Sequence, residues 1–219
     1  MEVPSMFDLS SKVALVSGAS RGIGAATAEI LAEFGAHVIL TSRKVENLEK
    51  VQKHIKNAGN QATAMVCHNG DLAQIELLFE KIHDKHGRLD ILVNNAATNP
   101  FYGSVLEVDE PAWDKTLAVN LKGPFFMSQH AAGLMRKNGG GSIVNVSSIN
   151  GRIPMLNQSI YSITKAALIS MTQTFAKELG EDKIRVNALL PGLTDTKFSS
   201  ALTQNEELMK NVLKQIPLG

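Results

Sequence analysis

Tyr161 and Lys165 are the residues whose types and spacing most directly suggest chemistry. Side chains four positions apart lie on one face of a helix, so a helix here would place the phenol beside the ammonium. A phenol has a pKa of about 10, and a nearby positive charge favours its ionised form. We therefore expect Lys165 to lower the pKa of Tyr161, so that Tyr161 can donate or accept a proton. Taken alone, the two residues could instead be an exposed helix pair.

A glycine-rich turn follows a short apolar run near the start of the chain. Its residues are Gly18, Ala19, Ser20, Arg21, Gly22, Ile23 and Gly24. Glycines between a strand and a helix let the backbone approach a pyrophosphate, and the unpaired amides of the helix N-terminus stabilise its charge. The turn therefore predicts a dinucleotide site, although a tight turn with positive φ angles would also use glycine.

Ser42 and Arg43 indicate which dinucleotide this site would bind. About twenty residues beyond such a turn, an acidic side chain binds the ribose of NAD, whereas an arginine accommodates the 2′-phosphate of NADP. The sequence has no carboxylate at this position, and Arg21 supplies a second guanidinium. We therefore expect NADP(H) to be favoured over NAD(H). Arg43 could also be a solvated residue, but a cation at a helix start opposes the helix dipole.

The composition indicates one globular domain that spans residues 1–219. The chain has 44% hydrophobic and 20% charged residues, which is ordinary for a globular protein, and its length suffices for one substantial core. The 22 Lys and Arg residues balance 21 Asp and Glu residues, so neither nucleic acid nor a membrane surface is an expected partner. The expected partner is a small molecule.

The single cysteine, Cys67, cannot form an internal disulfide, and the Cys and His residues lack the spacing of a zinc site. Residues 1–11 include acidic side chains and no continuous apolar run, so they predict neither a secretory signal nor a membrane anchor. We expect a cytoplasmic protein without a bound metal. His83 and His86 lie three positions apart, but their charged neighbours favour a solvated helix face.

Short β-branched runs alternate with longer segments of helical period, which is typical of an α/β fold with a parallel sheet. The predicted strands cover residues 13–16, 38–40, 62–67, 91–93, 143–146 and 184–190. The predicted helices cover residues 23–34, 45–57, 72–86, 110–137 and 161–179, with Pro124 interrupting the fourth. Spacing in the first helix predicts a buried stripe of Ile23, Thr27, Ile30, Leu31 and Phe34. Continuous apolar strands predict a doubly wound sheet with helices on both faces.

The candidate functional residues each follow a predicted strand. They are the glycine turn, Ser42-Arg43, Asn94-Asn95, Ser147-Ser148 and Pro191-Gly192. In open parallel sheets, ligands bind beyond the carboxyl ends of the strands. We therefore expect these loops to meet at one edge of the sheet.

These motifs make the chain similar to the classical short-chain dehydrogenase/reductase family along nearly its whole length. The resemblance rests on residues 17–24, Asn94-Asn95-Ala96-Ala97, Asn120, Ser148 thirteen positions before Tyr161, Tyr161-x-x-x-Lys165 and Pro191-Gly192. It implies a Rossmann-like fold and an oxidoreductase that transfers a hydride between a nicotinamide and a carbonyl or secondary alcohol. It also implies a homo-oligomer, either a tetramer or a dimer.

The resemblance implies a catalytic tetrad of Asn120, Ser148, Tyr161 and Lys165. Tyr161 would be the general acid or base, and Ser148 would donate a hydrogen bond to the substrate oxygen. Lys165 would also hold the nicotinamide ribose, and Asn120 would help to hold a water molecule. Beyond the glycine turn, Ser42 and Arg43, the implied cofactor contacts are His68, Asn69, Asn95, Ala96, Tyr161, Lys165, Pro191, Gly192, Thr194 and Thr196.

Three features depart from the family pattern. Ser17 stands where Thr is usual, which keeps a hydroxyl, and His68 stands where an Asp usually meets the adenine. His68 could still hydrogen-bond to adenine, or it could simply cap its own turn. The chain stops at Gly219, whereas family members usually continue into another helix and a final strand, so we expect that C-terminal strand to be missing.

One segment of the sequence bears on the identity of the substrate. Residues 96–103 are similar to a segment of NADPH-dependent carbonyl and retinal reductases in the family. A 3-oxoacyl-carrier-protein reductase is an alternative, and it would need a basic docking patch. A non-catalytic, NADP-binding regulatory protein is another alternative, which the intact tetrad argues against. A methyltransferase on a similar sheet would have no use for Tyr161 and Lys165.

Overall fold

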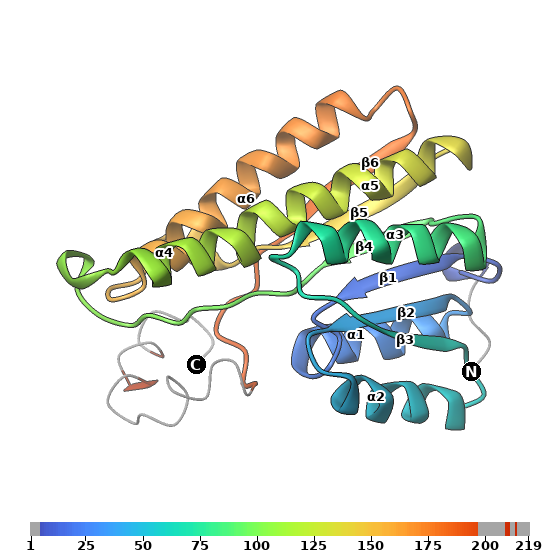
Figure 1. The fold of residues 1–219 in the computed structure, drawn as a ribbon, viewed down its shortest axis with the longest axis horizontal. Helices are drawn as coiled ribbons and strands as arrows, with labels where there is room; N and C mark the ends of the chain where they lie inside the picture. The colour runs from blue at the N-terminus through green and yellow to red at the C-terminus, as the bar shows by residue number, and fades with distance from the viewer. Residues whose placement is uncertain (1–4, 197–208, 211–212, 214–219) are drawn as a thin grey trace.

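The computed structural model describes residues 5–196, 209–210 and 213 of the chain (Figure 1). Six parallel strands form one sheet in the order β3-β2-β1-β4-β5-β6. The strands are β1 (Val13–Ser17), β2 (His37–Ser42), β3 (Ala62–Val66), β4 (Ile91–Asn94), β5 (Gly141–Val146) and β6 (Ile184–Leu189). The strand order reverses between β1 and β4, which is where such sheets bind their ligands. The predicted parallel α/β fold is confirmed.

Helices cover both faces of the sheet. They are α1 (Gly22–Glu33), α2 (Val45–Asn57), α3 (Leu72–His86), α4 (Glu110–Leu117), α5 (Gly123–Lys137) and α6 (Ser159–Glu178). Figure 1 shows α3, α5 and α6 on one face, and α1 and α2 on the other. The short helical turns are η1 (Ser5–Phe7), η2 (Val105–Glu107), η4 (Ile149–Gly151) and the π-helical turn η3 (Ala118–Lys122). Within the described ranges, no helix is long and apolar enough to span a membrane.

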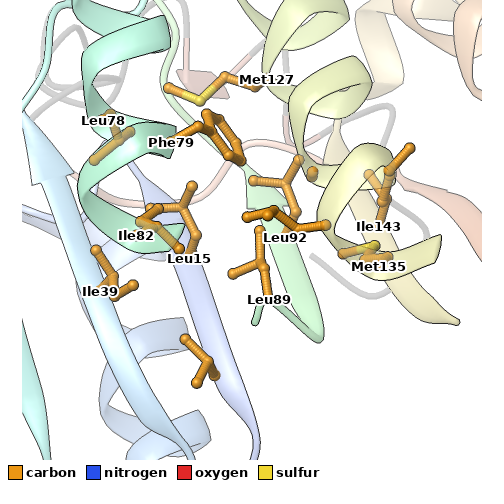
Figure 2. Packing of buried hydrophobic residues seen from close by; sticks show 14 of the residues in the cluster. Leu15, Ile39, Leu78, Phe79, Ile82, Leu89, Leu92, Met127, Met135 and Ile143 are labelled. Carbon is orange, nitrogen blue, oxygen red and sulfur yellow. The ribbon is translucent and has the colours of Figure 1, made fainter. Parts of the chain in front are cut away.

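The inner strands contribute to two separate hydrophobic cores, because successive side chains on a strand point to opposite faces. Leu15 packs with the residues of α3 and α5, whereas its neighbour Ala14 packs with those of α1 and α2. Figure 2 shows the first core, where Phe79 lies close to Met127 and Leu92. Burial on both faces explains why the strands read as continuous apolar runs.

Helix α1 buries a different stripe from the one its sequence predicts. Its buried residues are Gly24, Ala28 and Ala32, whereas Ile30 is 52% exposed. The spacing of the large apolar side chains therefore predicts the wrong buried face for α1. Small side chains let α1 approach the sheet closely, and the larger ones lie at the margin of the contact.

The long helical region after β4 is interrupted by η3, one turn before the position that the sequence predicts. Pro124 lies in the first turn of α5, directly after η3, and it has no N–H to donate to the main-chain oxygens of that turn. A Cβ atom on Gly123 would collide with the main-chain oxygen of Asn69. The start of α5 therefore packs directly against the loop that follows β3, and only glycine fits there.

Candidate active site

The glycine turn after β1 is bonded to the loop after β4. Asn95 Nδ2 donates to the main-chain oxygens of Ser17 at 2.9 Å and Gly18 at 3.2 Å. The Ser17 hydroxyl oxygen accepts from the main-chain N–H groups of Asn95 at 3.0 Å and Ala96 at 3.1 Å. These bonds fix both loops at the carboxyl edge of the sheet, beside the reversal in strand order. The hydroxyl that Ser17 keeps in place of the usual Thr thus fixes the turn.

The turn leaves the first amides of α1 available to an anionic ligand. Gly18 and Gly22 have φ angles of 68° and 56°, a region that favours glycine. Arg21 occupies the N-cap position without a side-chain cap, and the first turn of the helix has no acidic residue. Unpaired N–H groups and the positive end of the helix dipole therefore face outward. This arrangement fits the pyrophosphate of a dinucleotide.

Arg21 is the N-cap residue of α1, and Arg43 lies between β2 and α2. Both side chains are exposed, and neither is ion-paired with a carboxylate of the described residues. Ser42 Oγ donates to the main-chain oxygen of Lys44 at 3.0 Å, so its hydroxyl shapes the turn. The two guanidinium groups can therefore bind an anion without first breaking an ion pair among the described residues.

His68 and Asn69 follow β3, at the outer side of the site. The Nδ1 atom of His68 accepts from the Gly70 N–H at 3.1 Å, so the imidazole caps its own turn. A neutral ring then carries its proton on Nε2, which is not used by this bond. Asn69 is buried and donates to the Val119 main-chain oxygen at 2.9 Å. Its contact with a cofactor stays a prediction, as does that of His68.

The loop after β6 contacts both η4 and the glycine turn. The main-chain oxygen of Pro191 accepts from the Ile149 N–H at 3.0 Å, and Thr194 Oγ1 donates to the Gly192 oxygen at 3.3 Å. A Cβ atom on Gly22 would lie 3.3 Å from the Cγ2 atom of Thr196. Thr196 therefore lies next to the glycine turn, as a pyrophosphate contact requires.

Tyr161, Lys165 and Ser148 come together where β5 and α6 meet. Ser148 lies at the N-cap of η4, and its side chain lies close enough to Tyr161 for hydrogen bonding to lower the pKa of the phenol. Lys165 Nζ lies 5.5 Å from the centroid of the Tyr161 ring and donates to the Val146 main-chain oxygen at 2.7 Å. Tyr161 is 9% exposed and Lys165 is 2% exposed. The predicted juxtaposition of phenol, hydroxyl and ammonium is present.

Burial raises the pKa of Tyr161 above its ordinary value, and the hydrogen bond with Ser148 opposes this rise. The expected lowering of this pKa is therefore wrong for the protein without a cofactor, because burial outweighs the groups that favour the phenolate. Burial removes the water that would stabilise a phenolate, and it also lowers the pKa of Lys165 to about 8. Tyr161 is consequently neutral near pH 7, which is the state from which it can donate a proton.

The two neighbouring serines after β5 differ in their burial and in their contacts. Ser147 is buried, and its hydroxyl donates to the main-chain oxygen of Lys165 at 2.8 Å. Ser148 is partly exposed and lies beside the phenol. Ser147 thus anchors α6 to the sheet, and contact between Ser148 and a substrate stays a prediction. The spacing to Tyr161 predicts this choice between the two residues.

Asn120 lies in the π-helical turn η3 and is buried. Its Oδ1 atom accepts from the Thr98 N–H at 2.8 Å. Its Nδ2 atom donates to the Thr98 oxygen at 2.9 Å and to Thr164 Oγ1 at 3.2 Å. Single π turns within helices are frequent at functional sites. Asn120 therefore ties the loop after β4 to the residue that precedes Lys165, and its part in holding a water stays a prediction.

The sequence motifs do not predict a buried polar network that lies behind the site. Asn94 Nδ2 donates to Asn145 Oδ1 at 2.9 Å and to Ser128 Oγ at 3.0 Å. Asn145 Nδ2 in turn donates to Thr172 Oγ1 at 2.9 Å. The sequence does contain a signal for this network, since an asparagine ends or nearly ends each of two strands. In the sheet Asn94 and Asn145 are register partners on neighbouring strands. The network links α5, β4, β5 and α6.

Comparison with known proteins agrees with this geometry. The family model described as short chain dehydrogenase matches residues 12–207. The chain is 44% identical over 214 residues to dehydrogenase/reductase SDR family member 4 of Homo sapiens, covering 96% of this chain and 77% of that protein. The match thus extends over the glycine turn and all four residues of the predicted tetrad.

Solved structures have the same fold. A metagenomic short-chain oxidoreductase in complex with NADP is 38% identical, with a TM-score of 0.82, over 85% of this chain and 84% of that one. A gluconate 5-dehydrogenase from Burkholderia cenocepacia in complex with NADP and tartrate is 28% identical, with a TM-score of 0.92, over 96% and 82%. The chain therefore belongs to the short-chain dehydrogenase/reductase family of oxidoreductases.

Proposed function

We propose that this protein is an NADP(H)-dependent oxidoreductase that interconverts a small carbonyl compound and the corresponding secondary alcohol. One observation carries the proposal: the neutral, buried phenol of Tyr161 lies against Ser148 and Lys165 at the same sheet edge as the glycine turn. A bound nicotinamide would supply the hydride in this reaction.

Tyr161 is the proposed proton donor for carbonyl reduction. As the carbonyl carbon receives the hydride, negative charge develops on its oxygen, and a positioned acid must protonate that oxygen. Tyr161 is suited to this role because its raised pKa keeps it protonated at neutral pH. Ser148 would donate a second hydrogen bond to the same oxygen and stabilise the charge as it forms. The products are the alcohol, the oxidised nicotinamide and a tyrosinate that solvent reprotonates.

Lys165 is the proposed link between the phenol and the cofactor. Its ammonium lies 5.5 Å from the Tyr161 ring centroid, and its pKa of about 8 leaves it charged at neutral pH. That charge favours the tyrosinate left after proton transfer. The remaining N–H donors of Lys165 could hold the hydroxyl groups of the nicotinamide ribose.

Preference for NADP(H) over NAD(H) is proposed from the charges at the end of β2. Arg21 and Arg43 are exposed in the segments that follow β1 and β2, and no carboxylate stands directly at the end of β2 to bind a ribose hydroxyl. A guanidinium is the side chain that best recognises a phosphate dianion. The two solved relatives described above were also crystallised with NADP.

The surface beside Ser148 favours an apolar small molecule as the substrate. The loop after β4 is bonded to the segment after η4, since Gly103 N–H donates to the Asn157 oxygen at 3.1 Å. These two segments expose Leu106 (92%) and Leu156 (86%). The acidic residues Glu107 and Asp109 lie on the first of them, Glu110 begins α4, and all three are exposed. An acyl carrier protein is itself acidic, so this rim disfavours the 3-oxoacyl-carrier-protein alternative.

A panel of carbonyl substrates tests the proposed function. Aldehydes, ketones, diketones and acyl thioesters are each mixed with NADPH, and the loss of nicotinamide absorbance is followed. We expect turnover of apolar aldehydes or ketones. Tight NADPH binding without any turnover would contradict the enzymatic proposal and favour the regulatory alternative.

Two substitutions test the assigned roles. Tyr161→Phe should lower kcat by about 10²- to 10⁴-fold, the usual contribution of a general acid. Ser148→Ala should lower it by about 10²- to 10³-fold. Ser142→Ala is the matched control, because Ser142 lies at the opposite end of β5 and its hydroxyl contacts Arg185. Undiminished turnover in Tyr161→Phe would refute the proposed acid.

A further inference from the structure

Gln158 is a buried polar side chain at the start of α6, three residues before Tyr161. It is 4% exposed, and its residue is the N-cap of the helix. An N-cap side chain ordinarily accepts from the first helical amides. The Gln158 side chain makes no such bond, so its amide is not needed to begin the helix.

The amide of Gln158 instead joins three segments that surround Ser148. Its Oε1 atom accepts from Asn150 Nδ2 at 3.2 Å and from Asn99 Nδ2 at 3.4 Å. Its Nε2 atom contacts Met155 Sδ at 3.1 Å. Asn150 belongs to η4, Asn99 to the loop after β4, and Met155 to the segment between η4 and α6. A single buried oxygen therefore holds two loops at the substrate side of the site.

Asn150 connects this amide to the catalytic serine. Its main-chain N–H donates to Ser148 Oγ at 3.2 Å, and Asn150 is itself 8% exposed. A serine oxygen that accepts a hydrogen bond from one side keeps its own hydrogen for a bond on another side. The Asn150 N–H thus leaves the Ser148 hydrogen available to the Tyr161 oxygen or to a substrate oxygen.

We propose that Gln158 is a positioning residue for the reaction, which holds η4 through Asn150 so that the Ser148 hydroxyl points at Tyr161. The inference rests on the proposed function and deepens it. Of these contacts, the bond to Asn150 is the one that leads to Ser148, so Gln158 acts through that serine. Its bond to Asn99 also fixes the loop after β4, and we expect this second bond to affect substrate binding.

Titration of Tyr161 tests the role of the Gln158–Asn150 bond without any need for turnover. The chain has two tyrosines, so Tyr102→Phe leaves Tyr161 as the only phenol. Its ionisation is followed by absorbance at 295 nm in the apoprotein, with circular dichroism reporting the fold at each pH. Because the Ser148 bond lowers the pKa of Tyr161, Ser148→Ala should raise that pKa. Gln158→Leu should raise it in the same way, by about half a unit or more.

Two further variants separate positioning from a general loss of structure. Asn150→Ala removes the other partner of the Gln158–Asn150 bond and should raise the Tyr161 pKa to a similar extent. Asn99→Ala removes only the Gln158–Asn99 bond, so it should leave the pKa of Tyr161 unchanged and raise KM. The Gln158→Leu and Asn150→Ala effects should not add in the double variant, because both act through one bond.

Kinetic measurements complete the test. Gln158→Leu should lower kcat by about tenfold or more, since Ser148 is then less well placed, while the Kd for NADPH changes less than twofold. An unshifted Tyr161 pKa in Gln158→Leu, beside a raised one in Ser148→Ala, would overturn the inference. A folded Gln158→Leu protein with wild-type kcat would also overturn it. Absence of turnover in the wild-type protein would instead contradict the proposed function, and the titration would still decide the role of Gln158.

Discussion

The Nζ atom of Lys165 lies 5.5 Å from the centroid of the Tyr161 ring and donates to the Val146 main-chain oxygen at 2.7 Å. The ammonium therefore bonds to the backbone of β5 and lies near the ring, within the range of a cation–π contact. Both groups are buried, and burial moves the pKa of Tyr161 upward and that of Lys165 downward to about 8. In the apoprotein, burial consequently favours the neutral form of both groups.

Lys165 should make the stability of the apoprotein depend on alkaline pH. A lysine in the unfolded chain has a pKa of about 10.4, whereas burial lowers that of Lys165 to about 8. Between these values the unfolded chain binds more protons, so the free energy of unfolding rises with pH. Below pH 8 both states carry the proton, and the penalty of the buried charge is constant. Lys165→Met removes this dependence.

Urea unfolding of the wild type and of Lys165→Met at pH 7.5 and pH 10 measures the effect. The wild type should gain stability relative to the variant between the two pH values, by on the order of 1 kcal/mol or more. Lys177→Met is the matched control, because Lys177 is exposed on the same helix. An identical pH dependence in wild type and Lys165→Met would show that Lys165 titrates as a solvated lysine.

Arg43 and Arg21 should determine the preference between the two nicotinamide cofactors. Arg43→Gln should raise the Kd for NADPH by about tenfold or more, because a charge-assisted bond to the 2′-phosphate is lost. The Kd for NADH, which lacks that phosphate, should change less than twofold. Fluorescence titration of the reduced cofactors gives both constants, and Arg21→Gln tests the second guanidinium.

Lys50→Gln is the control for the general loss of positive charge near this site. Lys50 is exposed on α2, the helix that begins just after Arg43. Its replacement should leave both dissociation constants within twofold. Equal weakening of NADPH and NADH in Arg43→Gln would mean that the arginine does not contact the 2′-phosphate.

The fold and the meeting of the site loops could be predicted from sequence, because both follow from local patterns. Apolar runs that alternate with helical segments determine a parallel sheet, and all candidate loops then lie at its carboxyl edge. The buried face of α1 could not be predicted in this way. Periodicity gives weight to large residues such as Ile30, whereas the contact is made through Ala28 and Ala32.

The details of the site depend on contacts between segments that are distant in sequence. Asn120 is held by Thr98 and Thr164, which come from the loop after β4 and from α6. The pKa of Tyr161 depends on how much water the fold removes from the phenol, and a four-residue spacing contains no information about that burial. Spacing therefore predicts which side chains meet, and packing determines their charge states.

Cys67 should be unreactive in the native protein. Its side chain is 3% exposed, and burial together with the nearby Asp71 raises the pKa of its thiol to about 11. Only the thiolate attacks a disulfide reagent, and at pH 8 little of it is present. Since this is the single cysteine, labelling with a chromogenic disulfide reagent should be slow in buffer and reach one equivalent in urea. Rapid labelling of the native protein would mean that the end of β3 opens readily.

Gly24 should tolerate no side chain, although it lies in a helix where alanine is ordinarily preferred. A Cβ atom at this position would collide with Asn95 Nδ2 and with the main-chain oxygen of Gly18. Gly24→Ala must therefore displace the bonds that join the glycine turn to the loop after β4. We expect a loss of about 1–3 kcal/mol in the free energy of unfolding, as for an overpacked core, together with weaker NADPH binding.

Gly133→Ala provides the opposite case on another helix. Gly133 is exposed within α5, and a Cβ atom added there would meet no neighbouring atom within 4 Å. The substitution should raise the free energy of unfolding by about 0.5–1 kcal/mol, because alanine restricts the unfolded chain and favours the helix. Urea unfolding of both variants thus compares the same chemical change in contact with a neighbouring loop and in open space. Stabilisation of Gly24→Ala would mean that the glycine turn can move away from Asn95, contrary to the rigid pyrophosphate site inferred from these contacts.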